Sequence, residues 1–198
     1  MTTTTWNSHV GRSGLPRQVG AKAVRPSRRL RSCLDLAADG LLASVEPARR
    51  LEIMKDSRAG SWAVIALFLL LLGKFVAVRA VPPLLLIAPP VVGRWVAALA
   101  SWAYPYARRE GIGGYFRQGL GRPQIITATV LMLLAVGGLA LIGHPVALLA
   151  PLIGLALLVG GGRWAAGRLG GGLTGDVYGA LCEITELACL VALSVRIG

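Results

Sequence analysis

Cysteine and acidic residues are scarce in this sequence. Its 198 residues include 3 cysteines, and 9 Asp and Glu residues stand against 21 Lys and Arg residues. An odd cysteine count argues against a disulfide framework, so Cys182 and Cys189 are expected to be reduced core residues. The excess of positive charge, +12 in total, would indicate nucleic-acid binding in a soluble protein.

Apolar residues exclude that soluble class. They make up 55% of the chain, and the mean hydropathy is +0.64, which is too high for an ordinary soluble domain. We therefore expect a lipid bilayer as partner and no nucleic acid. Residues 1–33 are polar and basic without the apolar core of a signal peptide, and we expect a disordered leader there, with an organelle transit peptide as the alternative.

The apolar residues gather in runs of about 20, the length that spans a bilayer. They predict an all-α, integral membrane helical bundle with about five transmembrane helices. Pro89 and Pro90 lie inside the second run, so its helix is expected to be kinked or to begin late. The expected spans are residues 62–80, 84–103, 125–142, 145–162 and 175–194.

The basic residues orient these spans. Most lie in residues 1–60 and in the loops 104–124 and 163–174, which the positive-inside rule places in the cytoplasm. The polar, motif-like segments of the chain then share the cytoplasmic side. Among them is an acidic helical segment, residues 35–58.

Acidic residues in this segment are spaced by four. Asp35 and Asp39 form one such pair, and Glu52 and Asp56 form another. In a helix each pair lies on one face, and paired carboxylates suit Mg²⁺ together with phosphate oxygens. A solvated cytoplasmic helix held by salt bridges explains the same spacing, so both interpretations stay open.

A second polar segment, ARREGIGGYF, follows the second span. It joins arginines to Gly111, Gly113 and Gly114. Glycines let the backbone approach a phosphate, and arginine binds phosphate through two nitrogens. The alternative is an ordinary flexible, positively charged loop.

The last span carries three acids, Asp176, Glu183 and Glu186, on one helical stripe. An unpaired carboxylate deep in a membrane is costly and must face the bundle interior. Arg94 lies at a matching depth, so we predict a pair between Arg94 and Glu183 or Glu186. Lys74 is expected to extend to the outer interface instead.

Several strings together resemble a known family, the cobalamin synthases, which are adenosylcobinamide-GDP ribazoletransferases. The segments EIMKDSR, GRWVAALASWAYPYARREGIGGYF and GGLTGD followed by ExxE occur in the family's order. The resemblance covers residues 38–195, and we assign residues 34–198 to one membrane-embedded ribazoletransferase-like domain.

The resemblance implies a Mg²⁺-dependent phosphotransferase of cobalamin biosynthesis. Such an enzyme joins adenosylcobinamide-GDP to α-ribazole or its 5′-phosphate and releases GMP. The expected partners are these corrinoid and ribazole substrates. The expected location is a bacterial inner membrane with the active site facing the cytoplasm; the oligomeric state stays open.

The resemblance also assigns roles to residues at matching positions. The metal ligands would be Asp39, Asp56 and Asp176. Phosphate binding would fall to Lys55, Arg58, Arg108, Gly111 and Gly113. Catalytic roles would fall to Asp56, Asp176 and Arg108. Structural buried charges would be Arg94, Glu183 and Glu186.

The sequence departs from the family in two places. Asp35 is one position out of register, and Leu36 stands where an aspartate is expected. Basic residues 1–33 replace further apolar spans, so the chain is expected to be shortened or altered at its start. Three other interpretations stay open: a CDP-alcohol-type membrane phosphotransferase, a transporter or proton pathway, and an inactive remnant of the family.

Overall fold

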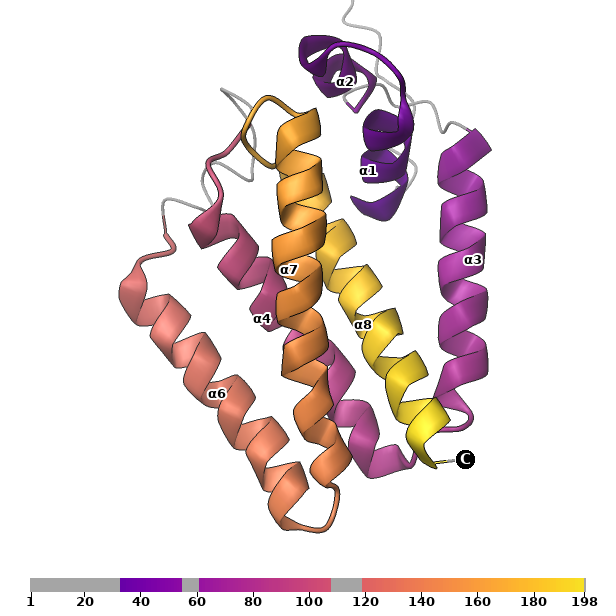
Figure 1. Cartoon of the computed structure of the whole chain (residues 1–198), viewed down its shortest axis with the longest axis vertical. Coiled ribbons are helices and arrows are strands. Elements are labelled where there is room, and N and C mark those ends of the chain that lie inside the picture. The colour runs from indigo at the N-terminus through magenta and orange to yellow at the C-terminus, as the bar shows by residue number, and fades with distance from the viewer. Residues whose placement is uncertain (1–32, 55–60, 108–118, 198) are drawn as a thin grey trace, which may run out of the picture.

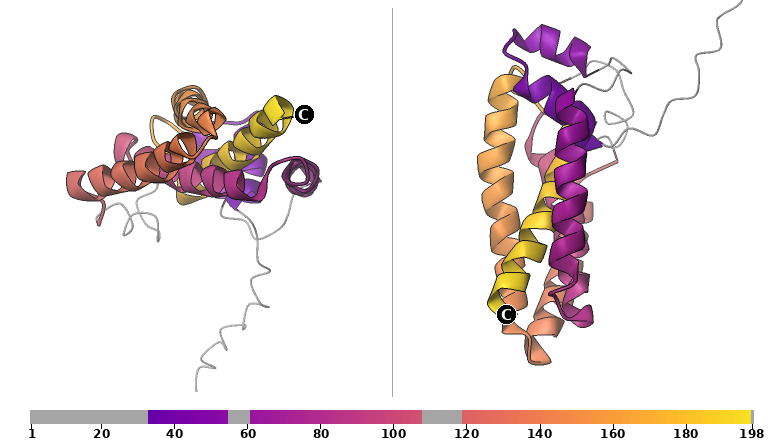
Figure 2. Two further views of the ribbon diagram at one scale, coloured as in Figure 1. Left: turned by 90° about the horizontal axis from the view of Figure 1, so that it is seen from below. Right: turned by 90° about the vertical axis from the view of Figure 1, so that its right-hand side faces the viewer.

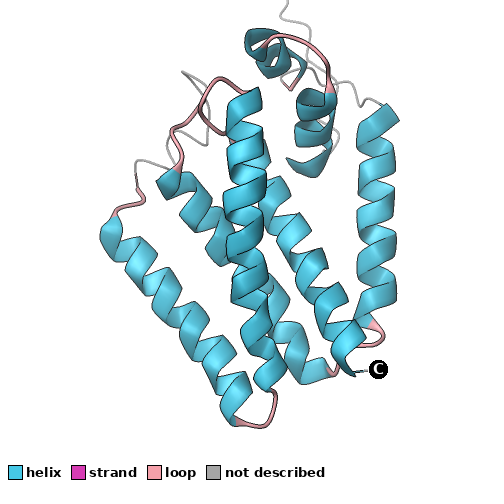
Figure 3. Cartoon of the chain, in the orientation of Figure 1, coloured by secondary structure: helices cyan, strands magenta, loops and turns pink. Residues whose placement is uncertain are grey.

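The computed structural model describes residues 33–54, 61–107 and 119–197. Every element in these ranges is helical (Figure 3), which confirms the predicted all-α class. The α-helices are α1 (Cys33–Leu42), α2 (Pro47–Ile53), α3 (Ser61–Val78), α4 (Ala88–Ala103), α6 (Arg122–Leu141), α7 (Leu149–Arg168) and α8 (Gly175–Ile197). Two short 3₁₀ helices, η1 (Pro83–Ile87) and η2 (Pro145–Leu148), lead into α4 and α7.

The five predicted spans correspond to α3, α4, α6, α7 and α8. Four stretches are long and apolar enough to cross a membrane: Pro83–Ala103, Arg122–Leu141, Pro145–Arg168 and Gly175–Val195. The apolar part of α3, Val64–Val78, is shorter. Within the described ranges the structure therefore supports an integral membrane bundle of four full spans and one shorter apolar helix.

The proline pair acts at the start of α4. Pro89 and Pro90 occupy its first turn, where the missing N–H groups would have no helical partner in any case. The helix therefore begins late, as predicted, and the residues before it form η1.

Helix α8 is the centre of the bundle. It packs against α4, α7, α3 and α1, whereas α6 packs mainly on α4 (Figures 1 and 2). Small residues allow the closest approaches: a Cβ on Gly93 would lie 3.0 Å from the Cys182 carbonyl oxygen, and one on Gly154 would lie 2.8 Å from the Val96 side chain. Such small contact positions are typical of membrane helix pairs.

Large apolar side chains cover the outside of the bundle. Phe68 and Phe75 on α3 are 63% and 60% exposed, and Leu134 on α6 is 67% exposed. This surface suits lipid tails, which solvate apolar side chains that water would not.

The long helices alternate in direction, so every second connecting segment lies at the same end of the bundle. One end of the bundle holds α1, α2, residues 104–107 and residues 169–176 (Figure 1); we call it the polar end. The opposite end holds the turn at residues 142–144 between α6 and η2. The predicted grouping of the motif-like segments at one end is thus found for the described residues.

Candidate functional site

The turn that leads into α8 is built from three glycines. Gly170 and Gly171 have φ of +80° and +97°, a region that side-chain-bearing residues rarely adopt. Gly172 has a different reason: a Cβ there would lie 2.7 Å from the Pro105 carbonyl oxygen and 3.0 Å from the Ala107 nitrogen. The sequence GGG therefore lets this turn lie directly against the chain that leaves α4.

Backbone hydrogen bonds join these two segments. The Leu173 N–H donates to the Pro105 oxygen and the Ala107 N–H donates to the Leu173 oxygen, both at 2.9 Å. Together they form an isolated parallel bridge between Tyr106 and Leu173. The end of α4 and the start of α8 are thus fixed side by side at the polar end.

Helix α8 begins directly after this bridge. The Thr174 carbonyl accepts the N–H groups of Val177 and Tyr178, both at 3.1 Å. Asp176 lies in the first turn of α8 and is half-buried, where the partial positive charge of the helix N-terminus stabilises a carboxylate. The Thr174 hydroxyl is fully buried and has no hydrogen-bond partner among the described residues.

The acidic segment packs over this end as a helical pair. A Cβ on Gly40 would lie 2.2 Å from the Met54 side chain, so this glycine lets α1 contact the end of α2. The buried Arg50 side chain donates to the Leu41 carbonyl at 2.9 Å, and Arg168 of α7 donates to the same oxygen at 3.1 Å. These contacts hold the C-terminus of α1, on which Asp39 lies, against the end of α7.

A shallow open depression adjoins these contacts. Its volume is about 720 Å³, and it is lined by Ser44, Val45, Glu46, Arg49, Arg50 and Arg168. The lining has three arginines against one glutamate, and Arg49 also pairs with Glu52. The surface keeps a net positive charge, which suits the negatively charged groups of a substrate.

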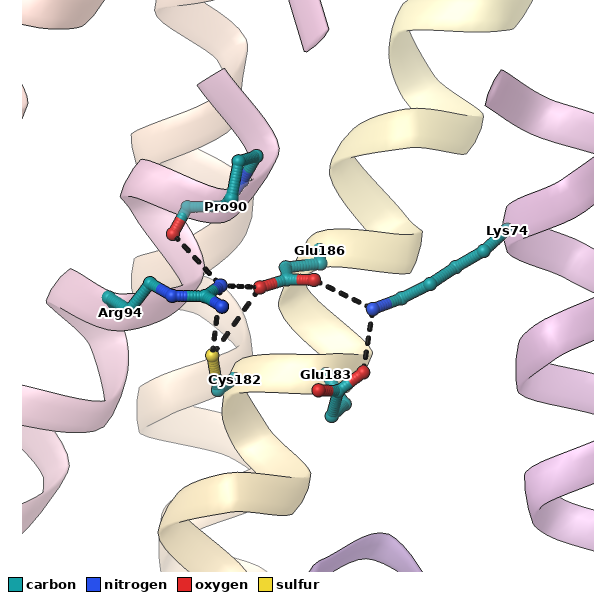
Figure 4. A network of polar contacts seen from close by, with 6 residues as sticks. All are labelled: Lys74, Pro90, Arg94, Cys182, Glu183 and Glu186. Atoms are coloured by element: carbon teal, nitrogen blue, oxygen red, sulfur yellow. Dashed lines mark hydrogen bonds and ion pairs between the residues drawn. The ribbon is translucent and has the colours of Figure 1, made fainter. Parts of the chain in front are cut away.

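A second polar group lies in the middle of the bundle (Figure 4). Glu186 of α8 forms ion pairs in two directions: Oε1 accepts from Arg94 of α4, and Oε2 accepts from Lys74 of α3 at 2.7 Å. Lys74 also donates to Glu183 Oε2 at 2.6 Å. We call these four residues the charge cluster; it joins three helices and has no net charge.

The charge cluster lies far from either end of α8. Glu186 is about 17 Å along the axis from Gly175, and Arg94 is about 14 Å from the end of α4 at Ala103. Gly93 makes room for the cluster, because a Cβ there would lie 2.8 Å from Glu186 Cγ. The sequence thus places its ionisable side chains where a lone charge would be most costly and pairs them there.

The predicted pair between Arg94 and Glu186 is confirmed, whereas Arg94 has no contact with Glu183 among the described residues. Burial is uneven. The Glu186 side chain is 13% exposed and that of Glu183 is 39% exposed. The predicted burial of Arg94 is wrong for the described chain, since its side chain is 68% exposed.

The prediction for Lys74 is also wrong. Its ammonium group turns toward α8 and bonds two carboxylates rather than reaching the interface. The sequence did contain a signal for this contact. Glu183 and Glu186 lie on one stripe of α8, and Arg94 of α4 can neutralise only one of them, so a second cation is needed at the same depth.

Comparison with known proteins decides the family. Residues 34–194 match the profile of the family described as Cobalamin-5-phosphate synthase. The chain belongs to this family. The resemblance seen in the sequence motifs is therefore confirmed.

Relatives in the cobalamin-5-phosphate synthase family share about two residues in five with this chain. The adenosylcobinamide-GDP ribazoletransferase of Synechococcus elongatus is 39% identical over 81% of the chain. Proteins of the same name from Syntrophobacter fumaroxidans and Klebsiella pneumoniae are 42% and 38% identical, each over 78% of it. The alignments span 64%, 63% and 64% of these relatives. No solved structure matches the chain.

Most of the predicted site residues of this family member lie outside the described residues. That holds for Lys55, Asp56, Arg58, Arg108, Gly111 and Gly113. Asp39 is described through its backbone, as part of α1, and Asp176 is described fully. The structure therefore brings α1 and the start of α8 to the same end, while the remaining roles stay predictions.

Proposed function

We propose that this chain joins adenosylcobinamide-GDP to α-ribazole, or to its 5′-phosphate, and releases GMP. The observation that carries the proposal is the family membership, together with relatives that bear the name of this transferase. The product would be adenosylcobalamin or its phosphate, so the chain would act in cobalamin biosynthesis.

The reaction requires exchange at one phosphorus atom. A ribose hydroxyl of the ribazole attacks the phosphorus that is bonded to cobinamide. The bond from this phosphorus to the bridging oxygen breaks, and GMP leaves with that oxygen. The hydroxyl proton passes to a carboxylate acting as general base.

We assign this chemistry to the polar end of the bundle. The bridge between Tyr106 and Leu173 holds the start of α8 beside the end of α4. Ala107, after which the next segment begins, therefore lies close to the first turn of α8, which contains Asp176. That following segment contains Arg108, Gly111 and Gly113, the predicted phosphate-binding residues. Lys55 and Arg58 come shortly after α2 in the sequence and are proposed to bind phosphate as well.

We further propose Mg²⁺ as the cofactor. Among the described side chains, no three Asp, Glu, His or Cys residues gather closely enough to hold a metal ion. The donor types nevertheless fit, because Asp39 lies on α1, which packs against α8, and carboxylate oxygens are preferred by Mg²⁺. Asp39, Asp56 and Asp176 would hold the ion, which would neutralise diphosphate charge when bound.

The orientation is part of the proposal. The polar end would face the cytoplasm of a bacterial inner membrane. Arg49, Arg50 and Arg168 lie at this end, and arginines at the ends of spans favour the cytoplasmic side.

The experiment is an assay of the purified full chain in detergent micelles with Mg²⁺, adenosylcobinamide-GDP and α-ribazole. We expect a cobamide product and GMP. Asp176→Asn should lower kcat by at least 100-fold, whereas Arg163→Gln, which removes an exposed charge of α7 toward the same end, should leave kcat within twofold. Turnover of a CDP-alcohol in place of these substrates, or no product at all, would contradict the proposal.

A further inference from the structure

The charge cluster leaves specific hydrogen-bonding atoms without partners. Within the part of the chain that the structure describes, Nη1 makes all the polar contacts of Arg94, so Nη2 and Nε make none. Glu183 uses only Oε2 there, for Lys74. The cluster therefore holds its own helices together while donors of Arg94 and an acceptor of Glu183 remain available.

These atoms are also accessible. The side chains of Arg94 and Glu183 are 68% and 39% exposed, in contrast to 13% for Glu186 and 22% for Lys74. Arg94 and Glu183, the outer residues of the cluster, are thus accessible, whereas Glu186 and Lys74 at its centre are largely buried. Figure 4 shows Arg94 and Glu183 on opposite sides of Glu186, one beside α4 and one facing α3.

Lipid tails cannot satisfy these atoms. A guanidinium group with unused donors, about 14 Å from the nearer end of its membrane span, Pro83–Ala103, needs oxygen acceptors or water in the middle of a membrane. The local surface of α4 supplies none: Val91, Ala97 and Ala98 lie on the same side of the helix as Arg94. A polar ligand is therefore the natural complement of this position.

Charge balance selects the kind of ligand. The two cations and two carboxylates of the cluster sum to zero, so a phosphate would gain little net attraction and would compete with Glu186 for Arg94. A neutral group that both accepts and donates hydrogen bonds, such as a sugar hydroxyl or a carboxamide, meets Arg94 and Glu183 without adding charge.

The spacing along α8 fits a long substrate. Glu183 and Glu186 lie about 11 Å and about 15 Å along the helix axis from Asp176. A molecule whose reacting end is at Asp176 would have to extend by this distance to reach the cluster. The corrinoid substrate is large enough to be anchored at a point remote from the reacting phosphorus and carries neutral carboxamides there, whereas the ribose of α-ribazole bears the reacting hydroxyl and stays at the reacting end.

We propose that Arg94 and Glu183 form a substrate-binding site inside the membrane for a neutral polar part of one substrate. That part is the carboxamide side chains of the corrinoid. This inference rests on the proposed function and adds a binding role to residues that the motifs marked only as structural. Glu186 and Lys74 hold the two binding residues in place.

Direct binding tests the inference. Equilibrium ultrafiltration of the full chain in detergent measures the Kd of adenosylcobinamide-GDP by its visible absorbance and of α-ribazole by its ultraviolet absorbance. We expect Arg94→Gln and Glu183→Gln each to raise the Kd of adenosylcobinamide-GDP at least tenfold and to leave the Kd of α-ribazole within twofold. A rise in the Kd of α-ribazole alone would contradict the assignment to the corrinoid carboxamides.

Two further variants control for the loss of an arginine elsewhere in the bundle and for a failure to fold. Arg79→Gln makes the same change directly after the C-terminus of α3, where Arg79 stacks on Phe75, and should leave both Kd values unchanged. Arg94→Gln combined with Glu186→Gln removes one charge of each sign, so it keeps the cluster neutral if Arg94→Gln alone fails to fold; the same tenfold rise is expected.

The outcomes separate the two proposals. Wild-type binding and turnover, with both Kd values unchanged in Glu183→Gln and in the folded Arg94 variants, would overturn this inference and leave the proposed function standing. A wild-type protein that binds neither substrate and forms no GMP would overturn both.

Discussion

The turn before α8 and the charge cluster in the middle of α8 are held in opposite ways. In the turn, backbone groups of Leu173 bond those of Pro105 and Ala107, and Gly172 permits the approach. In the cluster, side-chain charges rather than backbone groups bridge α3, α4 and α8 within the described helices. The turn depends on the absence of a side chain at Gly172, and the cluster depends on the charges of its side chains.

This difference indicates how each region can serve function. Because the turn is held by its backbone, its Thr174 hydroxyl is not needed to hold it. In the cluster, both oxygens of Glu186 are bonded, by Arg94, by Lys74 and by the Cys182 thiol, and outer atoms of Arg94 and Glu183 remain for a ligand. Substitutions should therefore fail differently in the two regions: by steric clash in one, and by unpaired charge in the other.

Removal of Glu186 should have the largest effect. Glu186→Ala leaves Arg94 without its carboxylate and Lys74 with one partner. Breaking a fully buried ion pair costs about 3–5 kcal/mol, and because the Arg94 side chain is 68% exposed we expect a loss near the lower figure, about 3 kcal/mol. Glu183→Ala should cost at most about 1 kcal/mol, because the side chain is 39% exposed and Lys74 keeps Glu186. Unfolding in mixed micelles measures both. Equal losses for the two variants would show that Glu186 is not the centre of the cluster.

Filling the space at Gly172 should have the next largest effect. Gly172→Ala places a Cβ 2.7 Å from the Pro105 oxygen and should lower the free energy of unfolding by about 1–3 kcal/mol. Gly167→Ala on α7 is the matched control, since no atom lies within 4 Å of its added Cβ. That variant should be neutral or slightly stabilising, because alanine favours helix. A similar loss in both variants would contradict the role given to Gly172.

The smallest effect is expected at Thr185, the residue directly before Glu186 on α8. Its hydroxyl is fully buried without a partner among the described residues, and its methyl group would lie 3.6 Å from a Cβ on Gly154. Thr185→Val removes the unpaired hydroxyl and should gain up to about 1 kcal/mol. Thr185→Ser keeps the hydroxyl, loses the methyl and should cost about 1 kcal/mol. The reverse order in thermal unfolding would show that the hydroxyl is hydrogen-bonded in the membrane.

The sequence predicted the helices well, because runs of about 20 apolar residues have few alternatives to a spanning helix. The late start of α4 followed from Pro89 and Pro90, and the shared depth of Arg94 and Glu186 predicted their pairing. The short apolar part of α3 was less predictable, since hydropathy alone does not locate the end of a helix.

Other features depend on how the helices pack. The helix boundaries alone do not show that the side chain of Lys74 on α3 points toward α8. A single lysine near a helix end more often extends its ammonium group to the membrane interface. Nor does a glycine triplet reveal its partner. The contact between Gly172 and Pro105 joins segments that are remote in sequence, so only the fold shows which of the three glycines must be small.

The stoichiometry of GMP release tests the central claim most directly. Purified protein, supplied with Mg²⁺, adenosylcobinamide-GDP and α-ribazole, should release one GMP for each cobamide formed, and no GMP when α-ribazole is omitted. GMP release that is independent of α-ribazole would indicate hydrolysis rather than transfer. That result, or the absence of both products, would contradict the account.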